Sequence, residues 1–242
     1  MFMQVRRGAW LVPVALAMLG LSVSACTNPR AKEPISQRST MARSAYTSAD
    51  ELPEKLSEDG TTIVVGDPQA PMVVRLYEDM RCPVCEEFEL QGSSTDLRGL
   101  TLKREVRTEY VLASFLDDRV GGNGSKKAAN ALRAALAQGK FAQYHAVLFA
   151  NQPEEVVDGY NDEFLLRMAS QVPGLRGPAF DSSVKEMKYA AFVTAAQKSY
   201  HASAGNRGTP SMDVNGRPVP DDERGVFFVR GWLETYLDSY ES

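Results

Sequence analysis

Two cysteines separated by two residues stand where an apolar segment gives way to a helical pattern. Cys82 and Cys85 follow segment 72–77, which is rich in Val, Leu and Tyr, and Pro83 comes directly after the first cysteine. Proline is favoured at the first position of a helix, because its missing N–H is not needed there and its φ angle is already helical. This pattern places both thiols at the end of a buried strand and in the first turn of a helix.

The predicted position favours reactivity of Cys82. A thiol attacks as the thiolate, so a reactive cysteine needs surroundings that stabilise negative charge. As the N-cap residue, Cys82 would face unpaired N–H groups and the positive end of the helix dipole, and Arg81 adds a cation. We expect a lowered pKa for Cys82, although Asp79 and two glutamates bring negative charge nearby. Cys85, one turn deeper, is expected to resolve a mixed disulfide formed at Cys82.

Two structural roles compete with a reactive dithiol. An inert disulfide would close a very short loop and constrain little of the unfolded chain. A zinc site needs about four ligands, and besides the pair the sequence offers only Cys26, His145 and His201. We therefore expect no metal and no cofactor. His145 lies on the apolar face of a helical pattern, which predicts a partly buried core residue, whereas His201 precedes a loop and could have a minor electrostatic role.

The N-terminal residues carry an export and anchoring pattern. Residues 8–25 hold no charge and follow Arg6-Arg7, as in a signal peptide. The small residues before Cys26 resemble the lipobox of bacterial lipoproteins, in which the cysteine is acylated and becomes the mature N-terminus. Three alternatives remain: a twin-arginine signal, an uncleaved anchor, since about 18 apolar residues can span a bilayer, and a secreted protein in which Cys26 is incidental.

Composition divides the chain into three predicted segments. We expect a lipoprotein signal peptide over residues 1–25, a flexible tether over 26–57 and one folded domain over 58–242. The tether is rich in Ser, Thr, Pro and charged residues and has no apolar periodicity, so it should contribute nothing to a core. The remaining part, about 185 residues, is long enough to bury one sizeable core.

Periodicity within the folded part predicts a mixed α/β fold. Segments rich in β-branched residues predict strands, and Asn215-Gly216 predicts a tight hairpin turn, which gives strands at 61–66, 72–77, 102–111, 211–214 and 217–219. Apolar residues at helical spacing predict a helical insertion over about 123–203 and a last helix over 230–240. Strands, then helices, then a hairpin and a helix indicate a mixed sheet with an inserted helical subdomain.

Charge excludes one class of partner. The chain has 27 basic and 31 acidic residues, a net charge of −4, and thus no basic excess to neutralise phosphates. We expect no nucleic-acid partner. Its 43% hydrophobic and 24% charged residues are typical of a globular protein and argue against a disordered one.

The residues around the cysteine pair resemble the active-site segment of DsbA-like thiol-disulfide oxidoreductases of the thioredoxin superfamily: Tyr77-Glu78-Asp79-Met80-Arg81-Cys82-Pro83-Val84-Cys85-Glu86-Glu87-Phe88-Glu89, preceded by Gly66-Asp67-Pro68-Gln69-Ala70-Pro71. A second match is Gly208-Thr209-Pro210-Ser211. The resemblance implies a thioredoxin-like fold, catalytic Cys82 and Cys85 that form a redox disulfide, and substrate binding by Thr209 and Pro210. In the family, the proline of this loop is cis and packs against the cysteines, so we expect a cis Thr209–Pro210 bond facing Cys82.

The dipeptide between the cysteines departs from the strongly oxidising members of that family. Arg81, Pro83 and Val84 are the candidate residues for tuning the site, and no histidine stands next to Cys85. Val84 cannot donate a hydrogen bond or carry charge, so the reduced state should be less favoured than in those members. We expect a milder oxidant.

The resemblance also implies partners and a location. The substrates would be thiols and disulfides of exported proteins, and a membrane quinone-linked partner of the DsbB or vitamin-K-epoxide-reductase-like type would reoxidise the site. We expect a monomer, located outside the cytoplasm and held to the membrane by lipid on Cys26. An oxidase is favoured over a reductase or isomerase with the same site, and a non-catalytic thioredoxin-like chaperone or metallochaperone is the rival outside enzymes.

Overall fold

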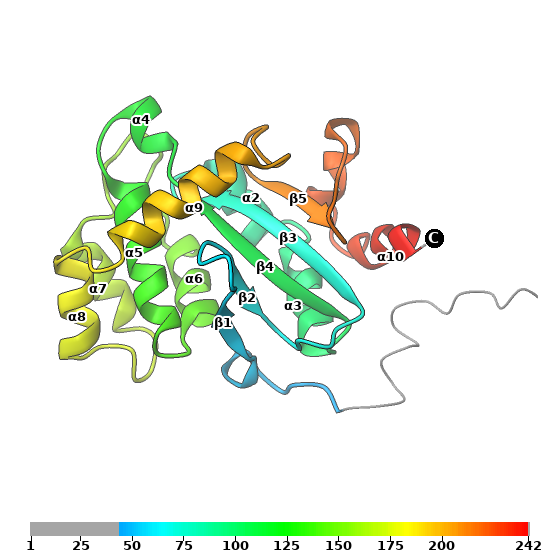
Figure 1. Cartoon of the computed structure of the whole chain (residues 1–242), viewed down its shortest axis with the longest axis horizontal. Coiled ribbons are helices and arrows are strands. Elements are labelled where there is room, and N and C mark those ends of the chain that lie inside the picture. Colours follow the sequence, from blue (N-terminus) through cyan, green and yellow to red (C-terminus); the bar gives the residue numbers. More distant parts are fainter. Residues whose placement is uncertain (1–43, 242) are drawn as a thin grey trace, which may run out of the picture. The chain divides into compact units, whose positions relative to one another are not determined.

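The computed structural model describes residues 44–241, and within this part the chain forms a mixed sheet with helices packed around it (Figure 1). The predicted signal peptide, Cys26 and residues 27–43 of the predicted tether lie outside the described residues. The six strands are β1 (Glu54–Leu56), β2 (Ile63–Val65), β3 (Met72–Asp79), β4 (Val106–Ala113), β5 (Ser211–Val214) and β6 (Arg217–Pro218).

The sheet has the strand order β1-β2-β4-β3-β5-β6. Only β3 and β4 run parallel, with Met72 opposite Val106 and Asp79 opposite Ala113, and the other pairs are antiparallel. The two parallel strands lie at the centre, where helices can cover both faces, which explains their nearly continuous apolar sequence. The predicted mixed α/β sheet is confirmed.

Helices occupy both faces of the sheet and one end of it. Figure 1 shows α9 crossing one face of the central strands and α2 and α3 behind them, while α4 to α8 gather beside the sheet. The helices are α2 (Pro83–Leu90), α3 (Ser94–Leu102), α4 (Leu116–Val120), α5 (Gly124–Leu136), α6 (Phe141–Phe149), α7 (Asp162–Ala169), α8 (Pro178–Lys185), α9 (Ala190–Ala202) and α10 (Leu233–Asp238), with 3₁₀ turns η2 (Ala49–Glu51), η3 (Asp221–Phe228) and η4 (Ser239–Glu241).

Several predicted boundaries shift. The strand expected at 102–111 begins at Val106, because Leu102 still belongs to α3 and a turn through Arg104, at φ 66°, separates the two elements. The hairpin at Asn215-Gly216 is present, and both residues have positive φ, of 50° and 77°. Asn and Gly tolerate that conformation better than other residues, which is why this dipeptide marks the turn.

The last residues of the predicted tether take part in the fold, contrary to expectation. β1 pairs with β2 through Glu54 and Val65, and the side chains of Leu52 and Leu56 pack against the core. The Glu54 carboxylate accepts hydrogen bonds from the backbone N–H groups of Phe141 and Ala142, at the start of α6. A three-residue edge strand surrounded by charged residues has no period that a sequence pattern can detect, and for this reason it was missed.

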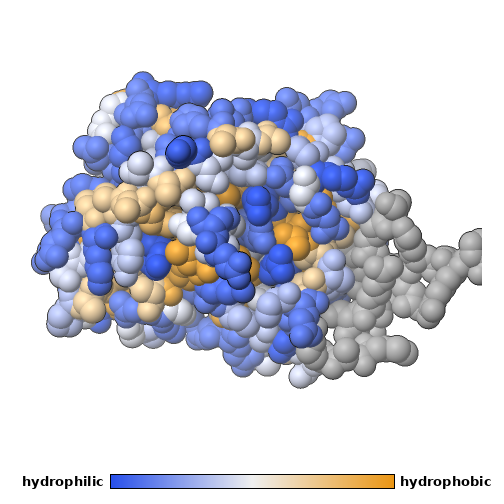
Figure 2. Space-filling model, viewed as in Figure 1, coloured by the Kyte–Doolittle hydropathy of each residue, from blue (hydrophilic) through white to orange (hydrophobic). Residues whose placement is uncertain are grey.

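Apolar side chains lie inside the folded part. The core joins the sheet to the helical insertion through large buried side chains such as Phe88, Phe141 and Phe149. Figure 2 shows the outside of the same view, where hydrophilic residues dominate and hydrophobic ones are seen mainly in hollows between them. Within residues 44–241, no helix is both long and apolar enough to cross a membrane.

Candidate active site

Both thiols of the pair lie where β3 ends and α2 begins. Cys82 is the N-cap residue of α2 and Pro83 is its first residue, as predicted. The Cys82 carbonyl accepts hydrogen bonds from the backbone N–H groups of Cys85 and Glu86, which closes the first turn of the helix. The side chains are free thiols, with Cys82 6% exposed and Cys85 fully buried. A reagent or substrate therefore has access to Cys82 before Cys85.

The environment of Cys82 favours its thiolate. A hydrogen bond from the Cys85 thiol lowers the pKa of Cys82 most, and the side chain of Thr209 and the backbone N–H groups of Cys85 and Val84 lower it further, against the opposing effect of burial. The two backbone donors belong to the first turn of α2, at the positive end of the helix dipole. The predicted direction of the pKa shift is confirmed.

The environment of Cys85 favours its thiol. Burial raises the pKa of Cys85 well above that of an ordinary cysteine, and the neighbouring Cys82 and the carboxylate of Glu78 raise it further. The two sulfurs thus differ in both access and protonation: Cys82 has the character of an attacking group and Cys85 that of a proton-carrying partner.

The loop before β5 lies against Cys82. The Thr209–Pro210 peptide bond is cis, as predicted, and the Cys82 thiol donates a hydrogen bond to the Thr209 carbonyl over 3.3 Å. The Ser211 hydroxyl donates to the carbonyls of Gly205 and Gly208, and the Gly208 N–H donates to the Tyr200 hydroxyl. Hydrogen bonds within the loop and one to Tyr200 of α9 therefore fix its conformation. The fold brings Cys82 and Thr209 together although they are 127 residues apart in the sequence.

Arg81 does not act as the free cation that the sequence suggested. Its guanidinium is buried and donates to the Asp117 carboxylate over 2.9 Å and to the carbonyls of Gly121 and Glu155. The positive charge is thus compensated by Asp117, which itself accepts from backbone N–H groups at the start of α5. Arg81 ties the residue before Cys82 to the helical insertion.

Two further side chains hold the turn before Cys82: Asp79, which the sequence indicated only as a nearby negative charge, and Gln152, which it did not indicate. The Asp79 carboxylate accepts from the Arg81 and Leu116 N–H groups and from the Ser125 hydroxyl, and burial raises its pKa to about 6. The Gln152 amide donates to the carbonyls of Met80 and Cys82. Gln152 lies 70 residues from Cys82 and has no motif around it, so no sequence signal pointed to it.

The remaining predicted residues fall in different surroundings. Val84 is 42% exposed on the first turn of α2, next to the thiols and open to solvent. His145 is a buried core residue, as predicted, and lies 3.0 Å from the Glu78 carboxylate. His201 is exposed at the end of α9, where its Nε2 lies 2.6 Å from the amide nitrogen of Gln197.

Comparison with protein families gives one match over most of the folded part. The model of a family described as Thioredoxin matches residues 58–225, which is more than half of the chain. No curated protein matches the sequence significantly.

Solved structures share the fold at low sequence identity. Oxidised BdbD from Bacillus subtilis is 20% identical, with a TM-score of 0.63 over 82% of this chain and 98% of that one. MdbA, a thiol-disulfide oxidoreductase from Corynebacterium diphtheriae, is 18% identical, with a TM-score of 0.58 over 84% and 98%. DsbA from Chlamydia trachomatis is 17% identical, with a TM-score of 0.60 over 74% and 92%. At such identities these likenesses establish the fold.

Proposed function

Since the chain belongs to the thioredoxin family, we propose that it is a protein thiol-disulfide oxidoreductase that exchanges disulfides through Cys82 and Cys85. The observation that carries the proposal is the asymmetry of the pair: Cys82 lies at the N-cap of α2 beside the Thr209 carbonyl, with a lowered pKa, and Cys85 is fully buried, with a raised pKa. An inert structural disulfide has no need of this difference. The names of the solved neighbours, DsbA, BdbD and MdbA, support the same activity.

The exchange runs through a mixed disulfide. When the pair is oxidised, a substrate thiolate attacks Cys82 Sγ, the Cys82–Cys85 bond breaks, and Cys85 leaves as a thiolate that takes up a proton in its buried setting. A second substrate thiolate then attacks the substrate sulfur of the mixed disulfide. The substrate disulfide forms, and Cys82 leaves as the thiolate that α2 and Thr209 stabilise.

We place the reaction in the oxidising direction. A stabilised Cys82 thiolate favours the reduced form of the pair, and a protein whose reduced form is stable is an oxidant of its substrates. Reduction potentials in the superfamily run from about −270 mV for thioredoxin to about −120 mV for DsbA. The absence of a charged or hydrogen-bonding side chain at Val84 places this protein below the upper end of that range.

The substrate would be an extended segment of an exported protein. The cis Thr209–Pro210 loop presents a half-buried Thr209 beside Cys82, where its backbone can pair with a substrate chain as an added strand. Exposed apolar side chains occur on two adjoining segments: Val84 in α2, and Val156 and Val157 directly after Glu155, whose carbonyl binds Arg81. These would receive apolar residues of a partly unfolded substrate.

The last part of the proposal concerns where the reaction takes place and what reoxidises the cysteine pair. We place the domain outside the cytoplasm, anchored by lipid on Cys26, with a membrane quinone-linked protein to reoxidise the pair. The predicted signal peptide and lipobox support this location. A redox state in intact cells that is mostly oxidised would support the oxidase, and a mostly reduced pair would instead indicate a reductase or isomerase.

Trapping of the mixed disulfide tests the assigned roles. In Cys85→Ser, the Cys82 thiolate can still attack a substrate disulfide and release one substrate thiolate, but no Cys85 thiol remains to break the mixed disulfide, so the covalent complex should accumulate and appear on non-reducing gels. Cys82→Ser is the matched variant and should trap far less, because Cys85 is fully buried and its pKa is raised. Equal trapping by the two variants would refute the assignment.

A further inference from the structure

Three buried side chains of metal-binding type converge behind the cysteine pair. They come from three elements: Glu78 from β3, Glu89 from α2 and His145 from α6. One potential ligand atom of each, a carboxylate oxygen or an imidazole nitrogen, lies within 4.8 Å of the other two. Their exposed fractions are 1%, 2% and 3%, so bulk solvent does not supply hydrogen bonds to these three side chains.

Each carboxylate uses one oxygen and leaves the other without a protein partner. Glu78 Oε2 lies 3.0 Å from His145 Nε2, and Glu89 Oε2 accepts a hydrogen bond from Arg98 over 2.8 Å. Glu78 Oε1 and Glu89 Oε1 are both buried and without a hydrogen-bond partner among the described residues. Leaving a buried acceptor unsatisfied is costly, and these two oxygens beside one imidazole are atoms to which an ion could bind.

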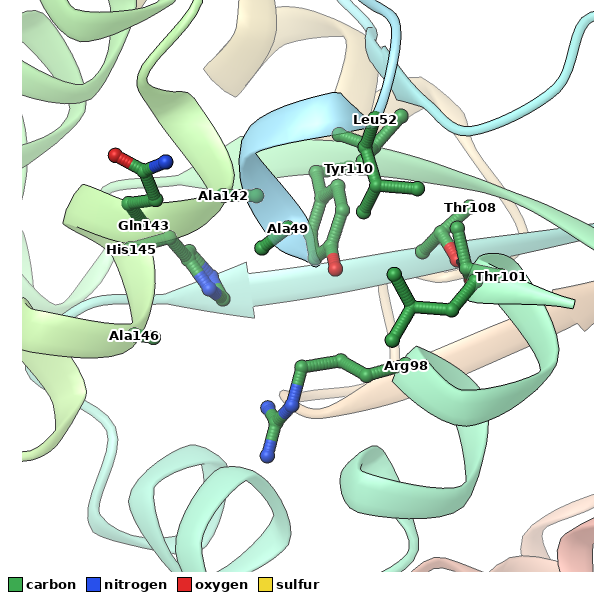
Figure 3. Close-up of a pocket in the computed structure, with 12 residues that line it drawn as sticks. Ala49, Leu52, Arg98, Thr101, Thr108, Tyr110, Ala142, Gln143, His145 and Ala146 are labelled. Atoms are coloured by element: carbon green, nitrogen blue, oxygen red, sulfur yellow. Dashed lines mark hydrogen bonds between the residues drawn. The ribbon is translucent and has the colours of Figure 1, made fainter. Parts of the chain in front are cut away.

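A cavity borders one member of this cluster, His145. It has a volume of about 120 Å³ and is lined mainly by apolar side chains, with His145 and Arg98 among its polar members. Figure 3 shows the His145 ring, from α6, and the Tyr110 ring, from β4, directed into the same space, with the Arg98 side chain of α3 below them. A space of this size admits water molecules beside the His145 ring.

We propose that Glu78, Glu89 and His145 bind one divalent transition-metal ion of the zinc type, with water from the cavity as a further ligand. One imidazole and two carboxylates form a donor set that such ions accept, whereas calcium and magnesium prefer oxygen ligands alone. Arg98 would hold the Glu89 carboxylate by Oε2 and leave Oε1 for the ion, the orienting role that neighbours of metal ligands commonly have.

This inference differs from the sequence expectation of no metal site. Positions 78, 89 and 145 have no recognisable ligand spacing, and the expected absence of zinc rested on the cysteines and histidines alone. The site is also distinct from the dithiol, since none of its three ligands is a sulfur. It can be tested whether or not the chain proves to be an oxidoreductase.

Metal titration of the full chain tests the proposal. The Cys82–Cys85 pair is first oxidised and the remaining thiol is alkylated, so that sulfur cannot bind the ion. Cobalt(II) alone is then titrated and followed by its visible absorption, and zinc(II) is added in competition. We expect one cobalt ion per chain, displaced by zinc, and a zinc X-ray absorption spectrum with an imidazole ligand, oxygen ligands and no sulfur.

Matched variants locate the ion. Glu89→Gln and His145→Gln should each weaken binding at least about tenfold, the lower bound for changes even outside the ligand shell. Glu87→Gln, at an exposed position of the same helix, and His201→Gln, the other histidine, should leave affinity unchanged. Failure of the oxidised wild type to bind one equivalent, or equal affinity in Glu89→Gln, overturns the proposal. If both ligand variants fail to fold, the wild-type absorption spectrum decides: absence of an imidazole ligand refutes it.

Discussion

Two residues separate the sulfurs of the dithiol, yet their surroundings differ in every respect that governs reactivity. Cys82 receives hydrogen bonds from the start of α2 and from Thr209, and Cys85 lies fully buried near the Glu78 carboxylate. Val84, between them, is exposed and apolar. The redox balance of the pair therefore depends on a few side chains around the sulfurs, and one of them can be changed without disturbing the core.

Val84→His should make the protein a stronger oxidant. An imidazole on the first turn of α2 can donate a hydrogen bond or carry charge next to the Cys82 thiolate, which stabilises the reduced form. We expect the reduction potential to rise by at least about 30 mV, the value for a tenfold change in a two-electron equilibrium. Equilibration with glutathione buffers measures it. Val84→Leu is the control for size, and an unchanged potential in Val84→His would contradict the argument.

Glu78 should make stability depend on pH. Burial raises its pKa to about 8 from 4.5, so between those values the folded chain holds a proton that the unfolded chain has lost. The free energy of unfolding should fall as the pH rises through this window. Glu78→Gln removes the titration, so its stability relative to wild type should increase from near pH 5 to near pH 8 by a few kcal/mol.

Urea unfolding at several pH values, with a chelator present to keep metal away, measures this difference. Glu87→Gln, exposed on α2, is the control for loss of a surface carboxylate. A difference between wild type and Glu78→Gln that stays constant with pH would show that Glu78 does not titrate in this window.

At the scale of elements, the helical insertion positions the active site through buried polar contacts. Arg81, at the end of the β3–α2 turn, forms an ion pair with Asp117 of α4, and both side chains are essentially without solvent exposure. Asp117 also accepts from the N–H groups of Ser125 and Lys126, at the start of α5. One carboxylate thus joins the turn before Cys82 to two helices.

Asp117→Ala should destabilise the domain strongly. The change leaves the buried Arg81 charge without its partner and removes an acceptor from the start of α5. Breaking a buried ion pair in this way costs about 3–5 kcal/mol. Chemical denaturation checks the value. Asp118→Ala, at a neighbouring exposed carboxylate paired with Lys126, should change stability by less than about 1 kcal/mol. Similar losses in the two variants would contradict the buried network.

At the scale of the whole molecule, the anchor and the redox domain should act independently. Cys26→Ser should abolish lipid attachment, because the acylated thiol is gone, and should leave dithiol exchange by Cys82 and Cys85 unchanged. Lipid labelling and membrane fractionation measure the first effect, and the rate of disulfide exchange measures the second. Lipid labelling that persists in Cys26→Ser would rule out Cys26 as the attachment site.

The local features of this protein follow from short stretches of its sequence. Strand patterns at 72–77 and 211–214, a proline that starts α2 and the Asn215-Gly216 turn depend on neighbours along the chain, and the structure confirms all of them. The position of Cys82 at the helix start, and with it the direction of its pKa shift, follows from the same local rules.

Contacts between side chains that are distant in the sequence depend on the three-dimensional packing. Gln152 at the Cys82 carbonyl, Asp117 on Arg81 and the cluster of Glu78, Glu89 and His145 join elements far apart in the chain. Arg81 is an example. The sequence shows that it precedes Cys82, but it does not show that Asp117, 36 residues away, compensates its charge. Such contacts depend on how helices pack on the sheet, and the packing of side chains from different elements leaves no periodicity in the sequence.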